Sequence, residues 1–255
     1  MNKHFFGDTA VLLGRTLRHI TRSPDTIITV SIMPIALMLL FRYVLGGAIN
    51  TGLGPGHYVN YLLPGILLIT IATGISYTTL RLFMDLQTGI FERFQSLPIA
   101  RSSVLWAHVA TSVVSTLISL VIVVLVALPM GFRSGAGVLA WLAVAGIVVL
   151  LTLALTWVAV IAGLSAKTAE GGGAYAYPLI FLPFISSAFV PTRTMPGPVR
   201  AFADNQPMTS IINTIRDLLA QQPVSASIWT GLAWCLGILI VAYAVAMITY
   251  HRKIA

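Results

Sequence analysis

The most constraining feature of this sequence is the recurrence of apolar runs long enough to cross a lipid bilayer. About 20 residues of helix, at about 1.5 Å per residue, span a hydrocarbon core about 30 Å thick. Charged residues make up only 9% of the 255 residues, against about 25% in soluble domains. Six runs reach the necessary length: residues 27–48, 58–80, 104–130, 138–164, 173–190 and 228–250. The sequence therefore predicts an all-α, multi-pass membrane protein with six transmembrane helices.

The fifth run, residues 173–190, carries the weakest pattern because Pro178 and Pro183 interrupt it. Prolines are tolerated in membrane helices when neighbouring groups satisfy the carbonyls that they free. We expect this run to span. Without it the number of spans would be odd, and the C-terminus would lie on the other side of the membrane.

The distribution of Lys and Arg predicts the orientation of the chain. Cytoplasmic connections carry an excess of these residues. With both termini in the cytoplasm, ten basic residues lie inside and five lie near or beyond the outer face. The inner set is Lys3, Arg15, Arg18, Arg22, Arg81, Arg93, Arg101, Lys167, Arg252 and Lys253, and the outer set is Arg42, Arg133, Arg193, Arg200 and Arg216. We expect the protein in the cell membrane (plasma or inner membrane).

The N-terminal segment, residues 1–23, has the pattern of an amphipathic helix. Apolar residues recur at spacings of three and four, and three arginines fall on the opposite face. The apolar set is Phe6, Ala10, Leu13, Leu17 and Ile20, and the arginines are Arg15, Arg18 and Arg22. This pattern predicts a helix on the membrane surface whose arginines face lipid headgroups or a soluble partner. A simple membrane anchor explains it equally well.

The connection over residues 81–103 lies on the predicted cytoplasmic side. Ile90, Phe94 and Leu97 repeat at helical spacing, while Glu92 and Arg93 take the other side. Pro98 disfavours helix in the residue before it and so ends this short helix. A rigid amphipathic helix joined to two spans can pass a push from a soluble partner into the membrane. A surface helix with no partner is the alternative.

The predicted outer connection, residues 191–227, is longer than a simple connecting loop usually is. Five prolines divide it: Pro191, Pro196, Pro198, Pro207 and Pro223. Between the last two, apolar residues form a stripe that is too short to span: Ile211, Ile212, Ile215, Leu218 and Leu219. We interpret this piece as a re-entrant or surface helix that caps an exit path. A packed outer lid with no gating role is the alternative.

Several kinds of chemistry find no support in the sequence. A phosphate-binding loop needs Gly-Lys followed by Ser or Thr, and none of Lys3, Lys167 and Lys253 follows a glycine. The five histidines are dispersed without metal-ligand spacing. Cys235 is the only cysteine, so no intrachain disulfide can form. We therefore predict no enzyme activity, no metal and no cofactor on this chain, although serines within spans, such as Ser119 and Ser186, leave a membrane hydrolase as a remote alternative.

The positions of the charged residues also distinguish between classes of protein. The formal net charge of +8 is spread over the ends of apolar runs, so it indicates membrane topology and not a nucleic-acid partner. A proton- or sodium-coupled carrier would need ionisable groups near the membrane centre. All seven acidic residues fall outside the predicted spans: Asp8, Asp25, Asp85, Glu92, Glu170, Asp204 and Asp217.

Two segments give the chain a resemblance to a known family. These are GIFERFQSLPIARSSV at residues 89–104 and FVPTRTMPGPVRAFADNQPMTSIINTIRDLL at residues 189–219. With the N-terminal amphipathic helix and six spans, they resemble the ABC-2 type permeases, most closely the daunorubicin/doxorubicin resistance group. The resemblance covers nearly the whole chain.

This resemblance implies one transmembrane permease domain over residues 1–255, with the type V ABC exporter fold. It implies a partnership with a second permease copy or paralogue and with two separate P-loop ABC ATPase subunits, which hold the ATP and Mg. Residues 81–103 would form the coupling loop and residues 1–23 the connecting helix, with Arg15, Arg18 and Arg22. The residues that would contact the ATPase are Gly89, Phe91, Glu92, Arg93, Phe94, Leu97, Pro98 and Arg101.

The implied function is ATP-driven export of an amphipathic drug-like or lipid-like molecule, and no residue is assigned to the substrate. Export of a polysaccharide or glycolipid is an alternative within the family. An ion-coupled secondary carrier, which would need no ATPase, is the alternative from another class.

Overall fold

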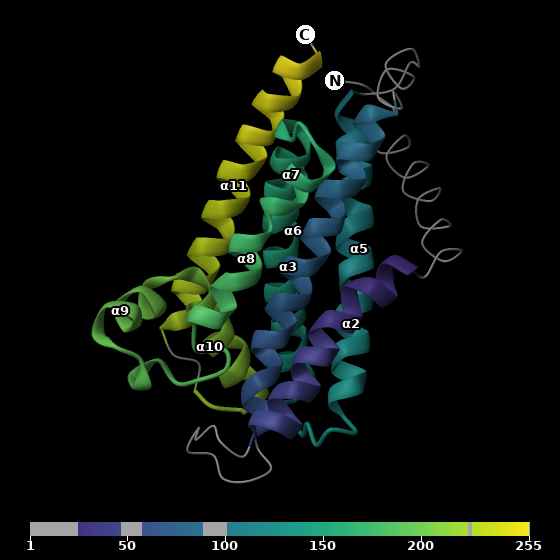
Figure 1. Cartoon of the computed structure of the whole chain (residues 1–255). Helices are drawn as coiled ribbons and strands as arrows, with labels where there is room; N and C mark the ends of the chain where they lie inside the picture. The colour runs from purple at the N-terminus through teal and green to yellow at the C-terminus, as the bar shows by residue number, and fades with distance from the viewer. Residues whose placement is uncertain (1–24, 47–57, 89–100, 224–225, 255) are drawn as a thin grey trace.

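The computed structural model describes residues 25–46, 58–88, 101–223 and 226–254. Within these ranges every regular element is a helix, and no strand occurs. The long helices run side by side as an elongated bundle (Figure 1). This agrees with the prediction of an all-α membrane protein.

Five of the helices are long and apolar enough to cross a membrane. They are α2 (Asp25–Leu39), which continues as the π-helix η1 (Leu40–Leu45), α3 (Tyr58–Gln87), α5 (Arg101–Ala127), α6 (Val138–Ser165) and α11 (Ser227–Ile254). They correspond to the first, second, third, fourth and sixth predicted spans. A count of six is therefore not confirmed by the described helices.

The fifth predicted span, residues 173–190, is not one long helix. Residues 169–185 form three short helices: α7 (Ala169–Ala174), α8 (Tyr177–Phe181) and η2 (Leu182–Ile185). Pro178 and Pro183 each begin a new piece, because proline fits the first turn of a helix but removes a backbone donor from its interior. The broken segment still runs along α3, with which all three pieces make contact (Figure 1).

The predicted coupling loop 81–103 is shorter than expected. Helix α3 continues seven residues beyond the predicted end of its span, to Gln87, and α5 already begins at Arg101. The residues from Arg81 to Gln87 are good helix formers, and the first glycine after them is Gly89. The connection between the two helices is thus confined to residues 88–100.

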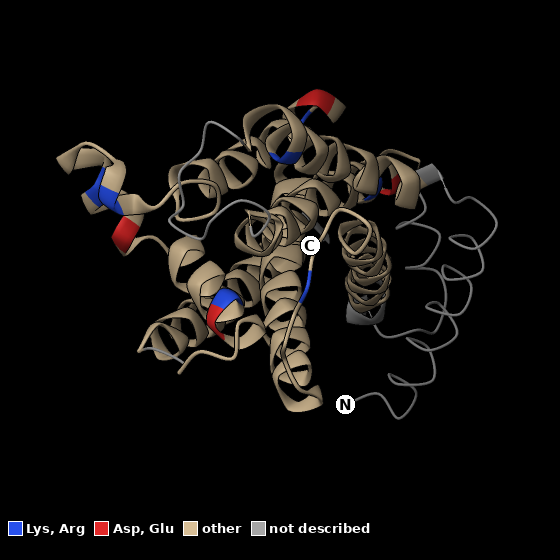
Figure 2. Cartoon of the chain, turned by 90° about the horizontal axis from the view of Figure 1, so that it is seen from below, with Lys and Arg blue, Asp and Glu red and all other residues tan. Residues whose placement is uncertain are grey.

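The direction of the chain alternates along the bundle. The end of α3, the start of α5, the end of α6 and the end of α11 lie together in the upper part of Figure 1, and α9 and α10 lie in the lower part. Lys167 and Arg252 belong to the upper end, and Arg133, Arg193 and Arg200 to the opposite end. These inner and outer basic residues, which the structure describes, therefore lie at different ends of the bundle. Figure 2, which looks at the bundle from below, shows that most of the described ribbon carries neither Lys or Arg nor Asp or Glu.

Helix α3 lies at the centre and is buried along most of its length. Small residues allow its close packing, as is usual between membrane helices. A Cβ atom at Gly65 would lie 2.5 Å from the Cβ of Ala188, and one at Gly74 would lie 2.7 Å from the Thr116 hydroxyl. Where α6 packs against α3, a Cβ at Gly163 of α6 would lie 3.1 Å from the Thr79 carbonyl oxygen of α3. Glycine thus sets how near α5, α6 and the broken segment come to α3.

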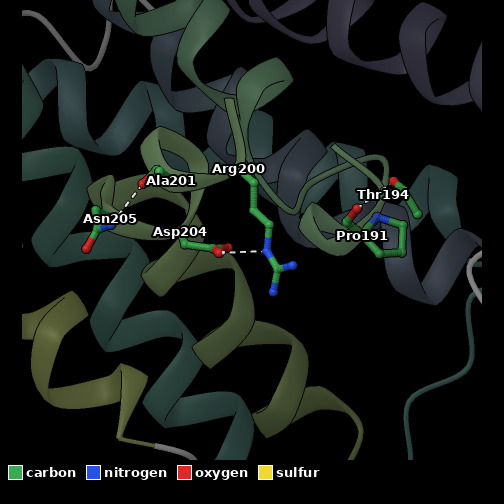
Figure 3. Close-up of polar contacts among 6 residues, drawn as sticks. All are labelled: Pro191, Thr194, Arg200, Ala201, Asp204 and Asn205. Carbon is green, nitrogen blue, oxygen red and sulfur yellow. Dashed lines mark hydrogen bonds and ion pairs between the residues drawn. The ribbon is translucent and has the colours of Figure 1, made fainter. Parts of the chain in front are cut away.

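The outer connection folds into η3 (Thr192–Thr194), α9 (Gly197–Asn205) and α10 (Pro207–Leu219). Helix α9 projects to one side of the bundle (Figure 1). Its polar contacts are local: Arg200 Nε lies 3.4 Å from Asp204 Oδ2, and Asn205 donates to the Ala201 carbonyl at 2.8 Å (Figure 3). In α10 the predicted apolar stripe is confirmed, since Ile211, Ile212, Ile215 and Leu219 are buried.

Candidate functional site

Most of the predicted ATPase-coupling residues lie outside the described residues. Gly89, Phe91, Glu92, Arg93, Phe94, Leu97 and Pro98 belong to residues 89–100, and the connecting-helix residues Arg15, Arg18 and Arg22 belong to residues 1–24. Arg101 is the first residue of α5. The coupling assignment stays a prediction, and the structure describes the two helices that flank it.

The end of α3 is closed by Thr88, which follows its last residue. The Thr88 hydroxyl donates to the carbonyls of Met84 at 3.1 Å and Asp85 at 3.2 Å, and its backbone N–H also donates to Met84. These bonds satisfy carbonyls that the end of a helix leaves free. Since α3 is the buried centre of the bundle, the connection 88–100 is attached directly to the helix that contacts most of the others.

A polar contact joins α3 to α5 at this end. His108 Nε2 lies 3.3 Å from Asp85 Oδ2. Asp85 is in the last turn of α3, so it lies within a long apolar helix and not in the loop where the sequence placed it. Deeper in the bundle, the hydroxyls of Thr78 and Ser112 form a second α3–α5 hydrogen bond. The two bonds hold the flanking helices together as one unit.

Edge-to-face aromatic contacts extend this unit to two further helices. The ring of Trp106 in α5 meets Trp157 in α6 edge-on at 5.1 Å between centroids. Trp157 in turn meets Tyr243 in α11 at 4.9 Å. Edge-to-face pairs stabilise such contacts by about 0.5–1.5 kcal/mol beyond their buried area. These ring contacts join α5 to α6 and α6 to α11.

At the opposite end, one glutamine anchors the outer connection to the broken segment. The Gln206 amide nitrogen donates to the carbonyls of Leu182, at 3.3 Å, and Ile185. Both carbonyls belong to η2, the last helical piece of the broken segment. Gln206 is 4% exposed, so water does not replace these bonds. The Gln206 side chain therefore joins the start of α10 to η2.

Arg216 of α10 joins three parts of the fold. Its guanidinium donates to the Tyr61 carbonyl at 3.2 Å, to the Ser187 carbonyl at 2.6 Å and to Asn213 Oδ1 at 2.8 Å. Its Cζ also lies 3.8 Å from the centroid of the Tyr61 ring, a favourable position for a cation–π contact. The Ser187 hydroxyl donates to Asn213 Oδ1 at 2.7 Å. Arg216 thus ties α10 to α3 and to the end of the broken segment.

Arg216 keeps its positive charge although its side chain is largely buried. Burial lowers the pKa of the guanidinium, while Tyr61 and Asp217 act in the opposite direction. Arginine starts from so high a pKa that it stays cationic in proteins. The sequence indicated only the apolar stripe of α10, because a single arginine in an outer segment gives no signal of its partners.

Further bonds close the outer end. Asn60 near the start of α3 exchanges two hydrogen bonds with the backbone of Arg133, at 2.9 and 3.0 Å. Ser134 donates to the Leu219 carbonyl at the end of α10, at 2.8 Å. Tyr58 donates to the Phe189 carbonyl at 3.2 Å. The arrangement is a polar seam across the end of the bundle that carries α10, and the end of α3 at Thr88 lies at the other end.

Comparison with known proteins places this arrangement in a family. Residues 8–220 match the ABC-2 type transporter family. Over 96% of its length the chain is 27% identical to the daunorubicin resistance ABC transporter permease protein DrrB1 of Streptomyces coeruleorubidus, of which 88% is covered. Over 97% of its length it is 26% identical to the probable doxorubicin resistance ABC transporter permease protein DrrC of Mycobacterium tuberculosis (strain CDC 1551 / Oshkosh), of which 90% is covered. The chain therefore belongs to the ABC-2 type transporter family and is the membrane subunit of an ABC exporter.

Proposed function

We propose that this permease exports an amphipathic, drug-like molecule and that separate P-loop ABC ATPase subunits drive it. The observation that carries the proposal is the match to drug-resistance permeases over nearly the whole chain. Two ATPase subunits, with their ATP and Mg, and a second permease copy or paralogue complete the proposed complex. Both termini and the connection 88–100 face the cytoplasm in this proposal.

The geometry supports a mechanical route for the coupling. Closure of the ATPases on ATP displaces the segment around Glu92, Arg93 and Phe94. This segment joins α3 to α5, which the Asp85–His108 contact and the Thr78–Ser112 bond hold together. The displacement then reaches α6 and α11 through Trp106, and the polar seam at the outer end must open for release.

The first experiment tests the partner. The tagged chain is purified from its native membrane in a mild detergent, and the proteins that stay bound are identified by mass spectrometry. Recovery of an ABC-type ATPase is the expected result. A chain that is recovered in high yield without such an ATPase would contradict the proposed drive and favour a gradient-coupled carrier.

The second experiment tests the coupling residues in the purified complex. Inside-out vesicles are supplied with ATP, and both doxorubicin uptake and ATP hydrolysis are measured. Phe94→Ala and Glu92→Gln are expected to lower uptake per ATP hydrolysed by about tenfold, the effect of about 1.4 kcal/mol of lost coupling. Gln87→Ala, at the exposed end of α3, is the matched control and should leave the ratio unchanged. Unchanged coupling in both variants would overturn the assignment of the segment.

A further inference from the structure

Three titratable side chains lie together beside the connection 88–100. Asp85 is in the last turn of α3, and His108 is near the start of α5. His108 Nε2 lies 3.3 Å from Asp85 Oδ2. The Asp85 carboxylate also interacts electrostatically with Arg81, one turn earlier on α3. One carboxylate is thus shared between a cation on its own helix and an imidazole on the neighbouring helix.

This contact differs from the other ion pair between two described residues. That pair, Arg200–Asp204, lies within α9 and is about half exposed. The side chains of His108 and Asp85 are 13% and 27% exposed, and the two residues belong to different membrane-spanning helices. Ionisable groups inside membrane helices are costly, and they mark functional positions. A role beyond the joining of two apolar helices is therefore expected for this pair.

Apolar packing already joins α3 to α5 at this level. Leu82 of α3 and Leu105 and Val109 of α5 are buried in one cluster. Apolar contacts are non-directional, whereas a contact between two polar groups depends on the distance and the angle between them. The Asp85–His108 contact therefore adds a defined position of one helix end relative to the other, which packing alone does not supply.

The pair lies where a displacement of the connection 88–100 enters the bundle. Asp85 is three residues before Thr88, whose hydroxyl donates to the Asp85 carbonyl at 3.2 Å. His108 is about two turns after Arg101, the first residue of α5. A force on the connection therefore reaches both side chains within a few residues. With the contact in place the two helix ends move together, and without it each end can move alone.

We propose that Asp85 and His108 are positioning residues that couple ATP hydrolysis to export. Their contact makes the end of α3 and the start of α5 move as one body when the ATPases displace the connection. The Arg81 guanidinium balances the charge of the shared carboxylate within the membrane. The inference rests on the proposed function and deepens it, because it names the residues through which the push reaches the helices.

The first test measures doxorubicin uptake per ATP hydrolysed in proteoliposomes that hold the complete exporter complex. His108→Leu removes the contact, whereas the amide of His108→Gln can still donate to Asp85. We expect His108→Leu to lower the ratio about fivefold while ATP hydrolysis continues, an effect within the range of coupled residue pairs. His108→Gln should retain most of the ratio. An equal loss in both variants would contradict a role for the contact.

A double variant assigns the effect to the contact itself. Asp85→Ala should lower the ratio as His108→Leu does, and the two changes together should be no worse than the more affected single variant. Effects that multiply would show that the two residues act separately, and this would overturn the proposal.

The control for loss of stability is Val109→Ala. It removes buried methyl groups from the cluster that also joins α3 to α5, so it should lower the melting temperature. It leaves Asp85 and His108 in place, so the uptake per ATP should be unchanged. A loss as large as that of His108→Leu would make uncoupling a general effect of destabilisation, and the pair would have no special role.

A second test needs neither ATP nor a substrate. Spin labels on Gln87→Cys and Ile118→Cys, at two exposed positions, report the distance between the end of α3 and α5 in a Cys235→Ser background. Double electron–electron resonance on the full chain in detergent should give a narrow distance distribution, also with His108→Gln or Val109→Ala. With His108→Leu the distribution should broaden.

The two tests separate this inference from the proposed function. An unchanged distance distribution in His108→Leu, or an unchanged uptake per ATP, would overturn the positioning role. A wild-type complex without ATP-driven uptake contradicts the proposed function instead, and the distance distributions then decide on the pair by themselves.

Discussion

At the scale of single residues, Arg216 brings several polar contacts together at one side chain. Its guanidinium contacts backbone carbonyls of two other segments, a neighbouring amide and an aromatic ring. Hydrogen bonds to a charged group stabilise a fold by about 1.5–3 kcal/mol, more than neutral ones do. By contrast, the Arg200–Asp204 pair of α9 is half exposed, and exposed pairs contribute at most about 1 kcal/mol.

This difference predicts the effect of two arginine substitutions. Arg216→Ala removes the charged hydrogen bonds to the Tyr61 and Ser187 carbonyls and to Asn213, and it should destabilise the protein by about 2–3 kcal/mol. Arg200→Ala should cost less than about 0.5 kcal/mol. Thermal unfolding of both variants in the same detergent measures the difference. Equal melting temperatures would show that Arg216 is not a structural anchor of α10.

At the scale of elements, the approach of the broken segment to α3 depends on one glycine. No side chain larger than a hydrogen atom fits at Gly65, because a Cβ there would lie 2.5 Å from the Cβ of the fully buried Ala188. Gly146 of α6 is the contrasting case, since a Cβ at that position would meet nothing within 4 Å. The two glycines share the helical conformation and differ only in their surroundings.

Alanine at these two positions should therefore have opposite effects. Gly65→Ala pushes residues 186–190 away from α3 and should destabilise the protein by about 1–3 kcal/mol. Gly146→Ala gains helix propensity and should stabilise it by about 0.5–1 kcal/mol. Thermal unfolding of the two variants in one lipid–detergent mixture gives the sign of each change. Destabilisation by both would mean that the effect of Gly65 is not a matter of packing.

At the scale of the whole molecule, the bundle places the end of α3 and the outer connection at opposite ends (Figure 1). Gln87 and Thr194 are both exposed, one at each end. With the orientation that we propose, a membrane-impermeant maleimide added to intact cells should label Thr194→Cys and not Gln87→Cys. The background variant is Cys235→Ser, which removes the one native thiol, itself buried.

Permeabilised cells provide the control for this labelling, since both cysteines should react once the reagent has access to both faces. Labelling of Gln87→Cys alone in intact cells would reverse the orientation. Labelling of both would mean that the two ends of the bundle do not face opposite sides of the membrane.

Much of the architecture could be predicted because it depends on local properties of the chain. Five long helices follow from the length and hydropathy of apolar runs, and the stripe of α10 follows from periodicity. The resemblance of residues 89–104 and 189–219 to a known family agrees with the family match over residues 8–220. The coupling residues that this resemblance implied remain a prediction.

The sequence by itself determined that the chain lies in a membrane. The thickness of the bilayer sets the length of apolar helix needed to cross it, and that length is visible in the sequence as runs of about 20 apolar residues. Only the tertiary structure decided how residues 169–185 pack along α3, since their three short pieces are held by contacts from distant parts of the chain, among them the Gln206 bonds to Leu182 and Ile185. It also decided which polar groups are paired. Arg216 finds partners on other segments, more than 25 residues away, because pairing depends on which helices pack side by side.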